Sequence, residues 1–213
     1  MPVETTHVEE SDGATGLLHR IVSSFLYVED KTDSVIFYPR LLLYIIFFIW
    51  GWHFILMDLD KNPFEIGRSF MHNIDLIFHE AGHVFFRPFG WFMMILGGSL
   101  GQLIMPLVVM LVFVFKNHDN FSASFGLWWL GQSCMDLAPY IDDALDQKMV
   151  LLGGRTGADA PGNHDWNNIL GDLNRLEKCH EYASIVDMTG TILMLLAFTW
   201  GAYILFQQYR NMT

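Results

Sequence analysis

Charged side chains are scarce in this chain of 213 residues. Lys, Arg, Asp and Glu together make up 16% of it, whereas soluble domains usually contain about 25%. Hydrophobic residues make up 52%. The shortage of charge argues against a soluble protein and predicts one embedded in a lipid bilayer, and the length fits one compact membrane domain.

Basic residues and cysteines are also few. The 12 Lys and Arg residues are scattered singly among 23 Asp and Glu, which argues against nucleic acid as a partner. The two cysteines, Cys134 and Cys179, form no C-x-x-C pair, so neither a disulfide framework nor a cysteine-bound metal is expected. Residues 1–34 are polar and acidic, without a basic start followed by an apolar core. We therefore expect no secretory signal peptide, and the first hydrophobic segment should remain as an anchor.

What the chain does contain is a series of long hydrophobic segments. They predict an all-α, polytopic membrane protein, because a helix of about 20 apolar residues can cross the hydrocarbon core of a bilayer. About five such segments can be recognised, at residues 41–57, 69–87, 91–115, 121–141 and 184–206.

Two polar regions accompany these segments. Residues 1–34 form an acidic tail with apolar residues at helical spacing over 15–30, which predicts an amphipathic helix that lies on the membrane or packs on the domain. Residues 35–213 are expected to form a single membrane domain. Its polar insert, about 142–181, begins as a Gly-rich loop and ends in an amphipathic helix over 166–182.

Lysine and arginine positions predict the orientation of the chain. If all five segments cross the bilayer, residues 1–34 and 142–181 lie on the same side. Eight basic residues then lie on that side and four on the other: Arg20, Lys31, Arg40, Arg87, Lys148, Arg155, Arg175 and Lys178 against Lys61, Arg68, Lys116 and Arg210. This excess predicts a multi-pass protein whose N-terminus is in the cytoplasm.

The segment His79-Glu80-Ala81-Gly82-His83 has the pattern H-E-x-x-H and lies within a hydrophobic segment. On a helix, His79 and His83 are four residues apart, so both imidazoles project from one face and can bind a single metal ion. Glu80 follows the first ligand, where it can take a proton from a metal-bound water. We therefore predict Zn²⁺ as the cofactor, His79 and His83 as ligands and Glu80 as the catalytic base.

The same helix carries two further ionisable residues on that face. Asp75 precedes His79 by four residues and His72 precedes it by seven. An ionisable stripe on an apolar helix must face a cavity, a metal or a partner. Asp75 is expected to accept the free N–H of His79 and so to orient it. The alternative is a buried helix whose histidines only hydrogen-bond to their neighbours.

A catalytic zinc site normally has three protein ligands, so a second element must supply one more. The candidates lie at the end of the fourth hydrophobic segment or in the insert after it: Asp136, Asp142, Asp143 and His164. The alternative for Asp142 and Asp143 is an ordinary helix end at the membrane surface. His164, Asp165 and Trp166 head the predicted amphipathic helix, where they could reach back to the metal or cap the helix.

The order of these features resembles the site-2 protease family of intramembrane zinc metalloproteases. That family has H-E-x-x-H on one membrane helix, then a small-residue segment of the G-P-L-x-N type, and later N-x-x-P followed by an L-D-G aspartate, the third zinc ligand. The matching stretches here are 79–83, Gly-Ser-Leu-Gly-Gln at 98–102, and Asp-Leu-Ala-Pro at 136–139, followed by Asp142 and Asp143. Ser99, Gln102 and Asp136 depart from the family's Pro, Asn and Asn, and no L-D-G is present.

The resemblance implies a metalloprotease domain over 35–213 that cleaves peptide bonds of membrane or membrane-proximal substrates. It favours Asp143 as the third ligand, with Asp142 and His164 as alternatives. The remaining polar residues near the motif are expected to support the ligands or line the site: His72, Asp75, Asp136 and Asp165. The expected partners are the lipid bilayer, a membrane-protein or peptide substrate and subunits of a membrane complex. The alternative, from another class, is a non-proteolytic metal-binding subunit or scaffold of a larger complex.

Overall fold

The computed structural model describes residues 6–57 and 65–212, which form helices and no β-strand. The predicted all-α class is therefore confirmed for these residues. The α-helices are α1 (Thr6–Leu26), α2 (Ser34–Ile55), α3 (Phe70–Phe86), α4 (Trp91–Val112), α5 (Asn120–Asp142), α6 (Asp165–Asp172) and α7 (Cys179–Arg210). Short 3-10 helices occupy Ile66–Arg68, Arg87–Phe89 and Leu176–Lys178, and a π-helical turn at Phe113–Asn117 continues α4.

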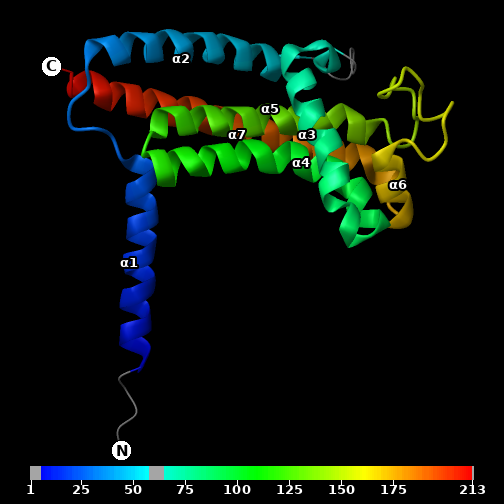
Figure 1. The fold of residues 1–213 in the computed structure, drawn as a ribbon, viewed down its shortest axis with the longest axis horizontal. Coiled ribbons are helices and arrows are strands. Elements are labelled where there is room, and N and C mark those ends of the chain that lie inside the picture. The colour runs from blue at the N-terminus through cyan, green and yellow to red at the C-terminus, as the bar shows by residue number, and fades with distance from the viewer. Residues whose placement is uncertain (1–5, 58–64, 213) are drawn as a thin grey trace, which may run out of the picture.

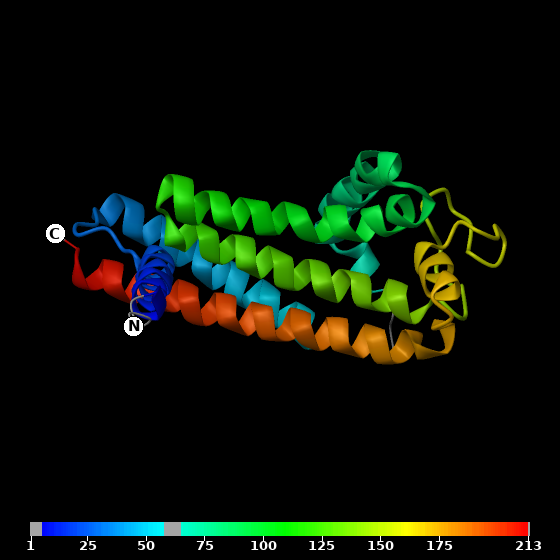
Figure 2. The same ribbon diagram turned by 90° about the horizontal axis from the view of Figure 1, so that it is seen from below.

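Four of these helices, α2, α4, α5 and α7, run side by side along the long axis of the molecule (Figures 1 and 2). α5 lies between α4 and α7 and packs most extensively on α7. Aromatic side chains join α2 to this pair. The buried Trp128 of α5 donates its indole N–H to the backbone oxygen of Phe47 at 3.1 Å, and Phe54 and Phe198 belong to the same apolar cluster.

Three segments of the described chain are long and apolar enough to cross a membrane: Ser34–Ile55, Trp91–Asn117 and Leu176–Arg210. α5 has 23 residues but does not join them, because it carries polar side chains such as Ser124, Gln132 and Asp136. These side chains are buried against neighbouring helices. A helix enclosed in this way can carry polar groups without exposing them to lipid. Of the five predicted hydrophobic segments, three thus belong to helices of the described chain that are long and apolar enough to cross a membrane.

α3 lies across the bundle near one of its ends (Figures 1 and 2). The helix predicted over 69–87 therefore forms, but it does not run along the bundle axis. Glycines allow its close contact with α4: a Cβ on Gly82 would collide with the backbone oxygen of Gly97, and one on Gly101 would collide with the backbone oxygen of Phe78. A single larger residue at either glycine would separate the two helices.

The crosswise position of α3 changes the topology that the sequence predicts. The chain passes along the bundle in α2, α4, α5 and α7, so α1 and the insert that contains α6 lie at opposite ends (Figure 1). The expectation that residues 1–34 and 142–181 share one side rested on five crossings, with α3 as one of them. The described parts of these ranges lie at opposite ends of the bundle, which does not support that expectation, and the side of a membrane that each faces stays a prediction.

The amphipathic helix predicted over 166–182 is interrupted. α6 ends at Asp172, and Asn174 has a left-handed backbone conformation with φ 53°, which ends the helix by turning the chain. A short 3-10 helix follows, and α7 begins at Cys179, five residues before the predicted start at Ser184. The turn directs α6 back toward the end of the bundle, where it packs against α4 and α5.

Candidate metal centre

The two histidines of the H-E-x-x-H motif share one face of α3. The helix begins after Ser69, whose hydroxyl oxygen accepts the backbone N–H of His72 at 3.0 Å, a typical N-cap. From this start the helical period places His79 and His83 one turn apart. Their ring centroids are 4.9 Å apart, with His79 buried and His83 half-buried. The structure thus brings the two imidazoles together.

Asp165, the first residue of α6, joins the two histidines. Its Oδ2 lies 3.0 Å from Nε2 of His79 and 3.3 Å from Nε2 of His83. The ligand atoms of the three residues lie within 4.8 Å of one another. Ligands placed tetrahedrally at about 2.0–2.1 Å from zinc are roughly 3.3 Å apart, so the three side chains could hold one ion. Among the described side chains, which are those of residues 16–57 and 65–212, no other set of three His, Cys, Asp or Glu residues forms such a group.

The other ring nitrogen of each histidine has its own partner. Nδ1 of His83 lies 2.8 Å from the backbone oxygen of Met94, and Nδ1 of His79 lies 3.2 Å from Oε1 of Gln102. Because both acceptors hold a proton on Nδ1, Nε2 is the nitrogen that each neutral ring would offer to an ion, and in the absence of an ion a protonated Nε2 donates to Asp165. The donor set, two neutral imidazoles and one carboxylate, suits zinc.

Gly98 of α4 provides the space for these rings. A Cβ at this position would lie 2.5 Å from Nε2 of His79 and 2.6 Å from Nε2 of His83. The atoms that it would meet include the two nitrogens suited to bind metal. The absence of a side chain at Gly98 is therefore a condition for the site, and this glycine belongs to the small-residue segment noted in the sequence.

Gln102 connects the histidines to a second polar pair. Its amide Nε2 donates to Oδ2 of Asp136 at 3.0 Å, and Nδ1 of His72 lies 3.0 Å from Oδ1 of the same carboxylate. His72 and Asp136 thus lie beside the site, on the wall of the same cavity. Gln102 is a residue whose role the sequence did not reveal, since only its place in the small-residue segment singled it out.

Asp75 does not orient His79, contrary to expectation. Its Oδ1 accepts hydrogen bonds from the indole N–H of Trp129 at 2.7 Å and from the hydroxyl of Ser133 at 3.1 Å, both on α5. The residue is fully buried. The four-residue spacing from His79 is right for one helix face, but the carboxylate points to donors on α5. Gln102, from α4, takes the position beside His79 instead.

Asp143, the predicted third ligand, lies apart from the two histidines, as do its alternatives. The Asp143 carboxylate accepts the backbone N–H groups of Lys148 and Met149, each at 2.8 Å, and lies 3.4 Å from Nε2 of His164. His164 is buried and caps α6 by accepting the backbone N–H of Asn167 at 3.2 Å. Asp142 is paired at 2.6 Å with an exposed histidine, His180. These residues organise the insert and do not reach the candidate site.

Two contacts hold Asp165 in place. Its backbone N–H donates to the hydroxyl oxygen of Tyr140 at 2.9 Å, and the indole N–H of Trp166 donates to the hydroxyl oxygen of Ser99, on α4, at 3.1 Å. The first turn of α6 is therefore fixed to both α4 and α5. Of the predicted sequence group His164-Asp165-Trp166, the middle residue reaches the histidines and its neighbours position it.

The electrostatic environment keeps Asp165 ionised. Burial alone would raise the pKa of its carboxyl group, but the hydrogen bonds from His79 and His83 outweigh burial and lower that pKa to about 2. The group therefore carries a negative charge at neutral pH. A buried carboxylate of this kind needs a cationic partner, and either a protonated histidine or a metal ion can serve.

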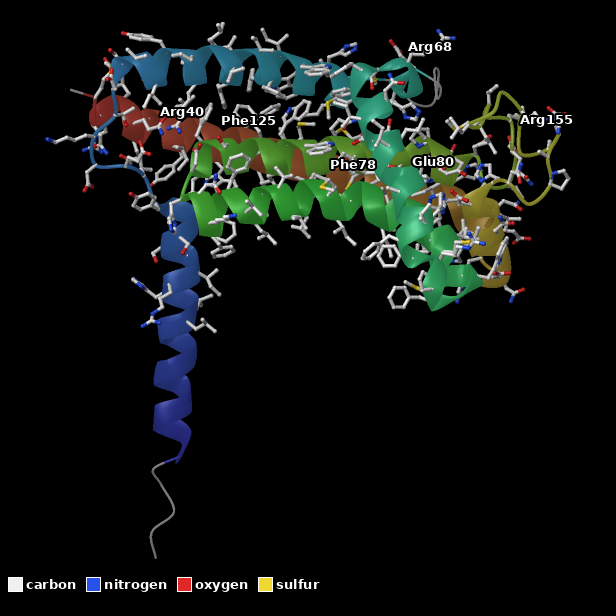
Figure 3. The ribbon with its side chains drawn as sticks, in the orientation of Figure 1. Arg40, Arg68, Phe78, Glu80, Phe125 and Arg155 are labelled. Carbon is white, nitrogen blue, oxygen red and sulfur yellow. The ribbon has the colours of Figure 1, made fainter. Side chains whose placement is uncertain are left out.

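A cavity of about 740 Å³ opens onto the three residues. Apolar residues contribute more of its wall than polar ones, among them Trp91 and Ile95 of α4 and residues 149–152 of the insert. Glu80 lies on the same wall and is exposed. It projects from α3 toward the insert, on the opposite side from Phe78 (Figure 3). The arrangement can bring a carboxylate, a metal ion and an apolar ligand into one space.

Comparison of the chain with known protein families, with curated proteins and with solved structures gave no match.

Proposed function

We propose that this protein is an integral-membrane zinc metallopeptidase that hydrolyses peptide bonds of membrane or membrane-proximal substrates. One observation carries the proposal: His79, His83 and Asp165 place three ligand atoms around one point, on the wall of a cavity that also contains Glu80. The resemblance to the site-2 protease family supports it through the H-E-x-x-H helix and the glycine segment beside it. We assign to Asp165 the role of third zinc ligand, which the resemblance assigned to Asp143.

Three ligands favour a catalytic site over a structural one. Structural zinc is usually enclosed by four protein ligands, whereas catalytic zinc keeps a position for water or substrate. Zinc bound here would polarise a peptide carbonyl and lower the pKa of a water molecule. His79, His83 and Asp165 would hold the ion, and Gln102 and the backbone oxygen of Met94 would hold the imidazoles in orientation.

Glu80 is proposed as the general base. It takes a proton from the attacking water and delivers it to the leaving amine, which is the role of the second residue in an H-E-x-x-H helix. Its exposure on the cavity wall supports this role, because the base must reach both water and substrate. The apolar cavity wall supports a substrate segment that is itself apolar.

The bundle is proposed to cross the bilayer with its long axis along the membrane normal, as the three long apolar segments suggest. The candidate site then lies near one membrane surface, at the end that holds α3 and α6 (Figure 1). With four passages, the basic residues of the described chain divide into six at that end and five at the other: Arg68, Arg87, Lys148, Arg155, Arg175 and Lys178 against Arg20, Lys31, Arg40, Lys116 and Arg210. This distribution no longer favours a cytoplasmic N-terminus.

The test measures metal and cleavage together on the purified protein in detergent. Zinc content is determined by mass spectrometry, and cleavage is followed with quenched fluorogenic peptides that contain an apolar segment. Glu80→Gln should retain zinc and lose activity, whereas Glu177→Gln, an exposed matched control outside the cavity, should change neither. If Glu80→Gln cleaved these peptides like the unmodified protein, or if the protein bound no zinc, the proposal would be wrong. Four protein ligands by X-ray absorption would instead indicate the non-proteolytic subunit.

A further inference from the structure

The helix α1 leaves the bundle at the end opposite the candidate metal centre and points away from the bundle axis at a steep angle (Figure 1). Its C-terminal end is held firmly. The buried amide of Asn120 donates to the backbone oxygens of Ser24 and Tyr27 at 2.7 and 2.9 Å, and the indole N–H of Trp200 donates to that of Phe25 at 2.9 Å. The last carbonyls of a helix lack partners within the helix. Here the bundle supplies those partners and so fixes the direction of α1.

One face of α1 is apolar and uncovered. Over its last three turns, the residues at positions i, i+1, i+4, i+5 and i+9 lie on one face of the helix. They are between 40% and 63% exposed: Leu17, Leu18, Ile21, Val22 and Leu26. We call them the α1 stripe. The opposite face carries His19, Arg20 and Ser23, all exposed.

The α1 stripe is continuous with the outer surface of α4. Phe25 contacts the ring of Phe115 edge-on, with centroids 5.8 Å apart, and Phe115 is itself 48% exposed. Val108 and Val112 continue this exposed apolar surface along α4, within a segment able to cross a membrane. Figure 3 shows nitrogen-bearing side chains on the side of α1 that faces away from the bundle and carbon-only side chains on the side beneath α4.

We propose that α1 is an in-plane membrane helix, whose stripe is immersed in the bilayer surface on the side opposite the metal centre. If the bundle axis follows the membrane normal, a helix held at a steep angle to that axis lies along the surface. The α1 stripe then faces the acyl chains and the polar face of α1 faces water. Helices of this kind are immersed by roughly 5–10 Å. Arg20 is the one Lys or Arg residue between positions 16 and 26, so a neutral lipid surface is sufficient. The inference rests on the bundle crossing a bilayer and not on peptidase activity.

Single-cysteine labelling of the full chain in phosphatidylcholine vesicles tests the proposal. The buried Cys134 and Cys179 are first replaced by alanine. A fluorescent NBD group is then attached through Leu18→Cys in the stripe or, as a matched control on the opposite face, through Ser23→Cys. Lipids with a spin label near the headgroup should quench the Leu18 probe at least twofold more than the Ser23 probe, and aqueous iodide should show the reverse preference. A third probe at Leu152→Cys, at the insert, reports on the opposite end of the bundle.

Each outcome of the labelling experiment either supports or contradicts the proposed placement of α1. Equal iodide quenching at positions 18 and 23 would show that α1 lies in water, and the proposal would fail. Protection of position 18 from both quenchers, lost when the protein is diluted in excess lipid, would show that a second copy covers the stripe. A membrane-impermeant reductant should bleach the α1 and Leu152 probes from opposite sides of vesicles with uniform protein orientation; bleaching from one side would contradict the proposed placement. Loss of zinc or of cleavage would leave these results unchanged, so this proposal and the proposed function fail separately.

Discussion

Replacing Asp165 by asparagine should abolish high-affinity zinc binding. The substitution keeps the size of the side chain and removes its charge, and the affected oxygen lies 3.0 and 3.3 Å from the two imidazole nitrogens. Loss of a residue that merely supports a ligand typically weakens metal binding by about 10–100-fold, so loss of the ligand should exceed about 100-fold. The measurement is competition with a zinc-sensitive dye at pH 7.5.

The same substitution should also destabilise the metal-free protein. The pKa of Asp165 is lowered from 3.8 to about 2, and this difference corresponds to about 2 kcal/mol. Because the pKa is lowered in the folded state, the stabilisation is present above pH 3.8 and is lost as the pH falls toward 2. At neutral pH, Asp165→Asn should therefore lower the thermal midpoint of the metal-free protein in detergent.

Asp143→Asn is the matched control, since it removes a carboxylate that also lies near a histidine, His164 at 3.4 Å. It should leave zinc affinity unchanged within about threefold, because Asp143 binds the backbone of the insert and not the candidate site. Retention of zinc by Asp165→Asn together with its loss in Asp143→Asn would refute the assignment of the third ligand.

Three further predictions concern the surroundings of the site. Gly98→Ala should prevent zinc binding, because the added Cβ would lie within 2.6 Å of both imidazoles. Gly67→Ala is the control, since this glycine lies on the same cavity wall and no atom lies within 4 Å of the added carbon. Zinc content measured by mass spectrometry should be normal in the control and lost in Gly98→Ala. Gln102→Leu should weaken zinc binding by about 10–100-fold in the dye assay, since His79 loses its orienting acceptor; an unchanged affinity would show that the acceptor is dispensable. Zinc affinity should fall as the pH falls below about 9, because the hydrogen bond to Asp165 raises the pKa of His83 to about 9 and a protonated imidazole cannot bind metal. Equal zinc retention after dialysis at pH 5.0 and 7.5 would contradict histidine ligation.

The sequence predicts the helices well and their directions poorly. The helix over 69–87 was predicted within one residue of each end, because the apolar pattern is a local feature. Its crosswise position is not local. It depends on Gly82 meeting Gly97 on another helix, and hydropathy contains no information on the angle between helices. The crosswise direction of α3 is what places α1 and the insert at opposite ends of the bundle.

In the candidate site, too, the features that depend on one helix were predicted and those that depend on packing between elements were not. The spacing of His79 and His83 specifies that they face one way, since both are on one helix. The third member required a choice among neighbouring polar residues on a different element, and the pattern of the insert does not determine it. His164 and Asp165 are adjacent, yet one turns inward to cap α6 and the other reaches the imidazoles. Tyr140 and Ser99, which fix this choice, lie on α5 and α4.

The wide separation of the candidate ligands along the chain has a consequence for biosynthesis. His79 and Asp165 are 86 positions apart, and α4, α5 and half of the insert are made between them. A nascent chain that has completed α3 therefore offers an ion only two imidazoles. Full coordination has to wait until α6 has docked on α4 and α5. Metal captured at that moment would tie the insert to α3, α4 and α5 and convert binding energy into folding energy for the insert. A chain starved of zinc during synthesis should then accumulate with α3 in place and the insert undocked, open to proteases that the finished protein resists.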